Sequence, residues 1–146
     1  MAIYSISRTA TVTTSGNAAG DVSVSTGLRP RVMEVGIFLG AATASTYALN
    51  RSSAVGTRTS PVALLPEDPA DPTLTGITLV DSAIAFSVQP TLASADLRAI
   101  ALPATIGTGM IWTFPRGLVI ATSGSLVIVN RATNAASAPF HIVCDV

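Results

Sequence analysis

The sequence predicts an all-β fold, an antiparallel two-sheet sandwich of the jelly-roll type, with an immunoglobulin-like sandwich as the alternative. Many short windows of the 146 residues alternate apolar and polar side chains, which is the pattern of half-buried strands. No long window combines the i, i+3, i+4, i+7 spacing of an amphipathic helix with helix caps. Chains of this kind protect their strand edges by forming sandwiches or barrels. Strand order cannot be read from spacing, so both topologies stay open for one expected domain over residues 1–146.

Four strands are expected in the N-terminal part of the chain. Apolar side chains alternate along the first of them, and Arg8 is the one charged residue on its apolar face. The third strand ends in an apolar run at positions 35–39, which is typical of a strand buried on both faces. The four expected strands are Ile3–Thr14, Val22–Ser25, Arg31–Leu39 and Thr46–Arg51.

The segment Ser52–Thr75 differs from its surroundings, because it contains four prolines and an acidic cluster. Proline cannot donate a ladder hydrogen bond, so this density of prolines disfavours a central strand. We therefore expect one long loop. Long loops in compact domains are usually functional, and this one is our candidate contact arm.

Seven strands are expected in the C-terminal part. Met110, Trp112 and Phe114 alternate on one face, which predicts that all three pack in the core. The sequence Pro115-Arg116-Gly117 predicts a tight turn that reverses the chain, and Thr122-Ser123-Gly124 predicts a second turn. The seven expected strands are Ile77–Val80, Ala83–Val88, Leu97–Leu102, Met110–Phe114, Leu118–Ala121, Ser125–Asn130 and Phe140–Val146.

The charge composition predicts a role in protein assembly. Charged residues make up 11% of the chain, all eight basic residues are arginines, and hydrophobic residues make up 49%. Protein–protein interfaces are depleted of Lys, Glu and Asp but retain Arg and aromatic residues. The composition therefore indicates a surface that is largely covered by other protein.

The same composition argues against several other partners. The net charge is zero and no basic patch is visible, so we expect no nucleic-acid binding. No stretch supplies about 18 continuous apolar residues, so we expect no membrane span. A basic n-region followed by an apolar h-region is missing at the start, so we expect a soluble protein made and used inside the cell.

Few residues could carry chemistry, and we expect no enzyme, no cofactor and no small-molecule substrate. His141 is the one histidine, and a Ser-His-Asp site would need it, but the strand rise places Asp145 roughly 13 Å away. A metal enzyme of the cupin type needs several histidines. Cys144 is the one cysteine and is expected to be a buried apolar thiol. Asn50-Arg51-Ser52 matches a glycosylation sequon, which carries little weight without a secretion signal.

Protein contacts are expected from the Ser52–Thr75 loop, from an N-terminal arm at Ile3–Arg8, and from the arginines that flank Pro30. Arginine keeps a planar fork that binds carboxylates at interfaces. The three acids of the loop could hold calcium, but the glycine pattern of a calcium loop is missing, so a solvated or arginine-paired loop is preferred and no metal site is expected. The candidate contact residues are Arg8, Arg29, Arg31, Arg58, Pro66, Glu67, Asp68 and Asp71.

Several segments of the chain form a set of scaffold motifs without a reactive group. They are Leu97–Pro115, Gly117–Ile120 and Gly124–Asn130 in the C-terminal half, with Tyr4–Arg8 and Glu67–Pro72 before it. In these segments the chain resembles small β-sandwich proteins encoded beside the structural genes of tailed bacteriophages, and the resemblance covers most of the chain. It implies a capsid cement (decoration) protein, a homotrimer that binds the major capsid protein on the outer surface of the virion after assembly in the host cytoplasm. The alternative is a carbohydrate-binding module of a phage tail or head fibre that binds the host.

Overall fold

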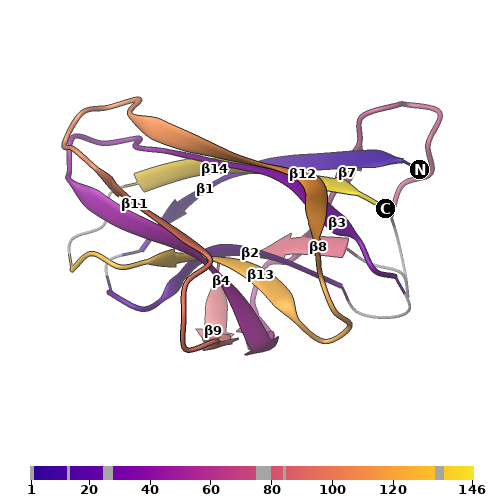
Figure 1. The fold of residues 1–146 in the computed structure, drawn as a ribbon, viewed down its shortest axis with the longest axis horizontal. Helices are drawn as coiled ribbons and strands as arrows, with labels where there is room; N and C mark the ends of the chain where they lie inside the picture. The colour runs from indigo at the N-terminus through magenta and orange to yellow at the C-terminus, as the bar shows by residue number, and fades with distance from the viewer. Residues whose placement is uncertain (1, 13, 25–27, 75–79, 84, 134–136) are drawn as a thin grey trace.

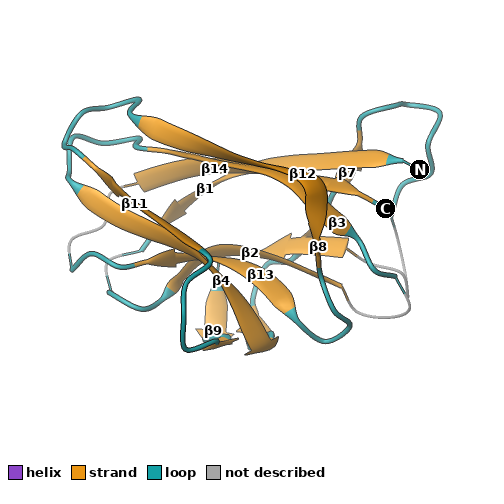
Figure 2. Cartoon of the chain, in the orientation of Figure 1, coloured by secondary structure: helices purple, strands orange, loops and turns teal. Residues whose placement is uncertain are grey.

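The chain folds into two antiparallel sheets that pack face to face (Figures 1 and 2). The computed structural model describes residues 2–12, 14–24, 28–74, 80–83, 85–133 and 137–146, and all of these lie in strands, turns or loops. The prediction of an all-β antiparallel sandwich is confirmed, and the arrangement is consistent with a jelly-roll or an immunoglobulin-like sandwich. Within the described ranges there is no helix long and apolar enough to cross a membrane.

The first sheet, sheet A, has five strands. Its central strand, β14, pairs with β1 on one side and with β3 on the other. The strands β12 and β7 form the two edges. In order across sheet A the strands are β12 (Gly109–Val119), β3 (Arg31–Phe38), β14 (Ser137–Asp145), β1 (Ile3–Thr11) and β7 (Leu65–Pro66).

The second sheet, sheet B, packs below sheet A in Figure 1. Its order is β10-β4-β13-β2-β8-β6, and β11 also pairs with β4. The chain crosses repeatedly between the two sheets, for example from β6 to β7 and from β11 to β12. The strands of sheet B are β10 (Thr91–Leu92), β4 (Ser45–Ala54), β13 (Ser125–Asn130), β2 (Ala18–Val24), β8 (Val80–Ala83), β6 (Val62–Ala63) and β11 (Arg98–Leu102).

The core lies between the facing sides of the two sheets. Phe140 of β14 is 1% exposed, and its ring occupies the space above Gly20 of β2. A Cβ atom at Gly20 would collide with that ring, so the bare backbone of β2 makes room for the phenyl group. Alternation on the central strand fits this arrangement, because Phe140, Ile142 and Cys144 are all buried. Other fully buried side chains are Ile37, Tyr47, Leu49, Leu126 and Ile128.

The Pro-rich segment is not one long loop, so that prediction is corrected. The strand β4 continues to Ala54, and the segment then contains β5 (Thr57–Arg58), β6 and β7. The strand β5 pairs with β9 (Phe86–Val88), which lies below sheet B in Figure 1. Leu64 and Leu74 belong to the core. Proline is accommodated because Pro66 lies in an edge strand, where a ladder donor is not needed.

The N-terminal segment is also a structural element and not an arm. The strand β1 lies between β14 and β7 in sheet A, and its buried residues Tyr4, Ile6 and Ala10 are those expected on the apolar face. The prediction of separate contact arms at Ile3–Arg8 and Ser52–Thr75 therefore has to be narrowed to the parts that stay exposed. In the Pro-rich segment these parts include residues 53–54 and 59–62 and the loop after β7 at residues 67–73.

The expected chain reversal at Pro115–Gly117 is wrong. The strand β12 runs continuously past these residues and pairs with β3 on both sides of them, at Thr113↔Glu34 and again at Leu118↔Val32. The strand β12 thus advances 118 − 113 = 5 residues while β3 advances 34 − 32 = 2, which is an enlarged β-bulge. Gly117 has a φ of 66°, which lets the chain absorb the extra residues.

Other expected strands agree in part. The turn at Thr122–Gly124 is confirmed, since the Gly124 N–H donates to the Ala121 carbonyl at 3.0 Å. In place of the expected strand Ala83–Val88, the structure has β8 and β9 on either side of residue 84. The expected strand Ile77–Val80 lies mostly outside the described residues. Met110 is 36% exposed and so is not the core residue we expected, whereas Phe114 is buried and Trp112 packs partly against the core.

Replacing Gly117 with alanine tests the bulge. Gly117 and Gly107 both have positive φ, at 66° and 82°, but a Cβ atom would meet Arg31 Cβ at 2.6 Å only at Gly117, and would meet nothing within 4 Å at Gly107. We expect Gly117→Ala to lower the free energy of unfolding by at least about 1 kcal/mol more than Gly107→Ala does. Urea unfolding measures both values. Equal losses would contradict the close approach of β12 and β3 at the bulge.

Candidate protein-contact surface

His141 lies on β14 and is held by β3. Its Nε2 atom is 2.8 Å from Glu34 Oε1, and its ring stacks on Phe38 with 6.1 Å between centroids. The ring covers Gly36, the residue opposite it on β3. Glu34 is therefore its acidic partner. Sequence reasoning missed this pair, because it depends on the β3–β14 pairing.

The side chain of His141 links β14 to β3 through its contacts with Glu34 and Phe38. Ser7 of β1 lies opposite His141, but its hydroxyl donates to the Phe140 carbonyl at 3.2 Å. The His141 side chain is 28% exposed, as expected for a half-exposed strand histidine. In the part of the chain that the structure describes, no group of three or more His, Cys, Asp or Glu side chains is placed to hold a metal ion.

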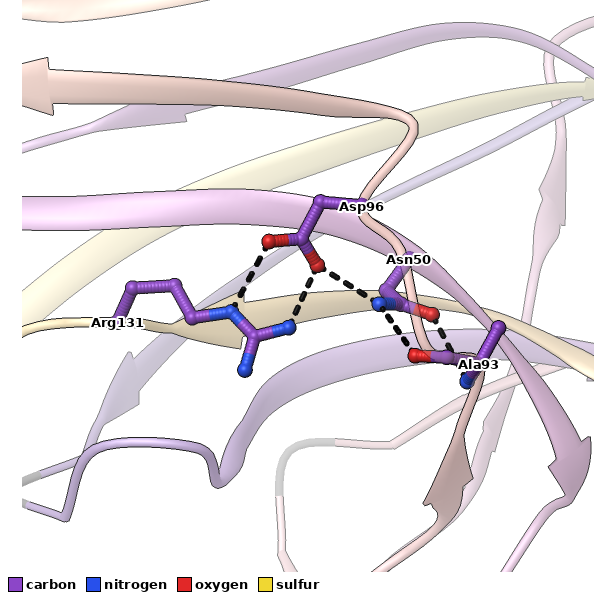
Figure 3. Close-up of polar contacts among 4 residues, drawn as sticks. All are labelled: Asn50, Ala93, Asp96 and Arg131. Carbon is purple, nitrogen blue, oxygen red and sulfur yellow. Dashed lines mark hydrogen bonds and ion pairs between the residues drawn. The ribbon is translucent and has the colours of Figure 1, made fainter.

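A polar cluster fixes the segment before β11 to sheet B (Figure 3). Asn50 is fully buried, and its Nδ2 donates to Asp96 Oδ1 at 2.7 Å and to the Ala93 carbonyl at 3.2 Å. Arg131 donates two hydrogen bonds to the same carboxylate, at 2.6 and 3.1 Å. The arginine hydrogen bond is the main reason that the pKa of Asp96 is lowered. The sequon at Asn50 is thus inaccessible in the folded chain.

The acidic loop after β7 is tied down by its backbone and leaves its carboxylates at the surface. The Glu67 N–H donates to the Ile3 carbonyl at 2.8 Å, and the Tyr4 hydroxyl donates to the Pro72 carbonyl at 2.9 Å. Glu67 and Asp68 are exposed, and Asp71 is half-buried. None of the ion pairs among the described residues includes these three acids. Of the two forms expected for this loop, solvated or paired with arginine, the structure has the solvated one.

Two of the candidate arginines are used inside the fold. Arg58 of β5 forms an ion pair of 2.6 Å with Asp21 of β2, and the two side chains are 12% and 0% exposed. It therefore cannot serve as the contact residue we expected. Arg8 is half-buried and its Nη1 donates to the Ser60 carbonyl at 3.2 Å.

A second, smaller apolar cluster lies on the outer face of sheet B. Phe86 and Leu92 pack there against Val127 and Val129, so the chain itself covers part of this face.

The other candidate arginines stay at the surface. Arg29 is exposed just before β3. Arg31 begins β3, and its Nη1 donates to the carbonyl of Arg116 in the β12 bulge at 3.4 Å. Arg31 and Arg116 line a hollow whose other lining residues are Ile3, Met33, Pro115 and Asp145. No carboxylate among the described residues lies within ion-pair distance of either arginine.

Exposed apolar side chains gather at both edges of sheet A. At the β12 edge, Ile106, Met110 and Ile111 are 67%, 36% and 47% exposed. At the opposite side, Leu65 of β7 is 60% exposed and Val62 of the adjoining β6 is 44% exposed. Sequence reasoning missed these residues, because they are exposed only as a result of the strand order.

The aromatic residues are withdrawn from the surface. All seven lie within the described ranges, and none of them is exposed. Cys144 is buried as expected, and burial raises the pKa of its thiol to about 12. The exposed side chains that could bind a partner by apolar contact or by charge are therefore aliphatic residues, arginines and acids.

Comparison with known protein families, with curated proteins and with solved structures finds no match to this chain.

Removing the charge of Arg58 tests the buried ion pair. Arg58→Met leaves the buried Asp21 carboxylate without its arginine, and we expect a loss of about 3 kcal/mol in the free energy of unfolding. Arg29→Met, at an exposed position, should cost less than about 0.5 kcal/mol. Denaturant unfolding compares the two variants. Similar values for both would contradict the pair.

The Asp96 cluster predicts a pH dependence of stability. Because the folded-state pKa of Asp96 lies below its usual 3.8, its contribution is present above that value and is lost as pH falls through the folded-state pKa. Both side chains of the pair are partly exposed, so we expect Asp96→Asn to cost about 1 kcal/mol at pH 7. The difference from the unmodified protein should shrink in acid. Urea unfolding at pH 7 and in acid measures it, and a difference independent of pH would contradict the ion pair.

Proposed function

We propose that the chain is a non-enzymatic structural protein of a tailed-bacteriophage virion. It acts as a capsid cement (decoration) protein that binds the major capsid protein on the outer surface of the shell and stabilises it, as a homotrimer. The proposal rests on the resemblance given above and on one structural observation, the open β12 edge of sheet A. It places assembly of the particle in the host cytoplasm.

The β12 edge supports a protein contact because it lacks the usual protection. Among the described strands, β12 pairs with β3 alone. Free strand edges attract other strands, and soluble proteins block them with lysines, prolines or bulges. The chain has no lysine, and the bulge with Pro115 protects only the second half of β12. The first half, Gly109–Thr113, carries the exposed Met110 and Ile111 and no charge.

A contact of this modest size is sufficient for a cement protein. Each copy contributes a small apolar patch, and many copies on one lattice multiply its effect. A rotational oligomer presents the same patch to several capsid subunits at once. We assign the capsid contact to Ile106, Met110 and Ile111 together with the β12 edge beside them.

The carbohydrate-binding alternative has less support. Sugars usually stack on exposed aromatic rings, and all seven aromatic side chains of this chain are buried or half-buried. Binding of the purified protein to a glycan array would favour that alternative over the cement role.

A capsid-binding experiment tests the proposal. The purified chain is mixed with capsid shells of the bacteriophage that encodes it, and co-sedimentation and the temperature of shell disruption are measured. We expect the unmodified chain to bind and to raise that temperature. Ile111→Asp should weaken binding by about tenfold or more, because it puts a charge into an apolar contact.

Val88→Asp is the matched control, because Val88 is 59% exposed but lies on β9, away from the β12 edge. It should bind as the unmodified chain does. Failure of the unmodified chain to bind shells would refute the cement role, and equal binding by both variants would refute the assignment to β12.

A further inference from the structure

The two edges of sheet A carry opposite charge at one end of the sandwich. The β12 side has Arg31 and Arg116, and the β7 side is followed by Glu67 and Asp68. Figure 1 shows the loop after β7 at the same end as the two chain termini. The edge strands β12 and β7 are four strand spacings apart, roughly 19 Å, and Arg31 on β3 is three spacings, roughly 14 Å, from β7. No ion pair among the described residues joins either arginine to Glu67 or Asp68 within one copy.

The basic side is a hollow with both charged and apolar lining. It is lined by Arg31, Arg116 and Asp145 together with Ile3, Met33 and Pro115, so its two guanidinium groups outnumber its one carboxylate. A ligand for such a hollow needs an apolar group next to one or two carboxylates, because the guanidinium groups bind carboxylates and the walls bind aliphatic groups.

The acidic side offers that combination. Leu65 is 60% exposed, and Glu67 and Asp68 follow it within three residues. The segment is held in a fixed shape by β7, which pairs with β1, and by the hydrogen bond from the Glu67 N–H to the Ile3 carbonyl. A preformed segment loses little conformational entropy on binding.

We propose that Leu65–Asp68 of one copy binds the Arg31–Arg116 hollow of a second copy. This inference rests on the proposed function, because it supplies the contact between copies that a rotational oligomer requires. The contact joins two different surfaces. Each copy can therefore insert its own Leu65–Asp68 segment into one neighbour and accept that segment from another, which is the arrangement of a closed ring. The capsid contact stays separate, since Ile106–Thr113 lies toward the other end of β12.

Charge reversal at each side, alone and together, tests the contact. Arg31→Glu with Arg116→Glu places like charges against Glu67 and Asp68, and Glu67→Arg with Asp68→Arg does the same from the other side. Each pair of changes alone should weaken self-association by about tenfold or more. The chain that carries all four changes should recover it, because opposite charges then face each other again. Light scattering with size separation over a range of concentrations measures the subunit number and the dissociation constant.

Arg98→Glu is the matched control, since Arg98 is exposed on β11 outside both surfaces. It should self-associate as the unmodified chain does. Thermal unfolding confirms that each variant is folded, and recovery in the combined variant excludes a loss caused by misfolding. A monomeric unmodified chain, or single-side variants that assemble normally, would overturn the inference.

The capsid experiment separates this inference from the proposed function. A chain that binds shells as a monomer would refute the contact between copies and leave the cement role intact. A chain that forms the charge-dependent oligomer but binds no shell would refute the cement role and leave the contact intact.

Discussion

The fold depends on the fit of the Phe140 ring against the bare backbone of Gly20. Phe140 lies on the central strand of sheet A, and Gly20 lies on β2 in sheet B. Sheets that pack face to face stand about 10 Å apart, and a phenyl ring fills that space only if the opposite residue is small. This contact joins the two sheets at the centre of the core. The flanking strands β1 and β3 are placed by their pairing with β14, the strand that carries Phe140.

The Pro-rich segment explains why the exposed apolar groups gather at sheet A. Its strand β5 pairs with β9, and Phe86 of β9 packs on Val127 and Val129 of sheet B together with Leu92 of the edge strand β10. The Arg58–Asp21 pair holds this cover in place. The chain thus uses its own residues to cover part of sheet B and leaves the two edges of sheet A exposed.

Alternation in the sequence was sufficient to find strands that have one buried face. The strands β3, β13 and β14 lie close to the ranges expected, and each pairs with a neighbour on both sides. Every second side chain is buried along most of β14, whereas all six residues of β13 are buried. Residues 115–117 were misread, because a proline and a glycine two positions apart serve equally well in a turn and in a bulge. Only the pairing with β3 distinguishes the two.

The exposed surface and its side-chain pairs were harder to predict than the fold, because they depend on distant pairings. Glu34 meets His141 across 107 positions, and Asp21 meets Arg58 across 37, so neither pair is visible as a local pattern. The exposure of Ile111 follows from the edge position of β12, which strand order decides. Glu67 and Asp68 were found from the sequence, because prolines on both sides keep them in a surface loop.

The burial of Cys144 has a practical consequence for work in solution. The chain has no other cysteine, and a thiol with a pKa near 12 is almost entirely protonated at neutral pH and reacts slowly with maleimides. A cysteine introduced at an exposed position would therefore take up a fluorophore or spin label selectively, with the native residue left in place. Because the chain also lacks lysine side chains, amine reagents would find few sites along it.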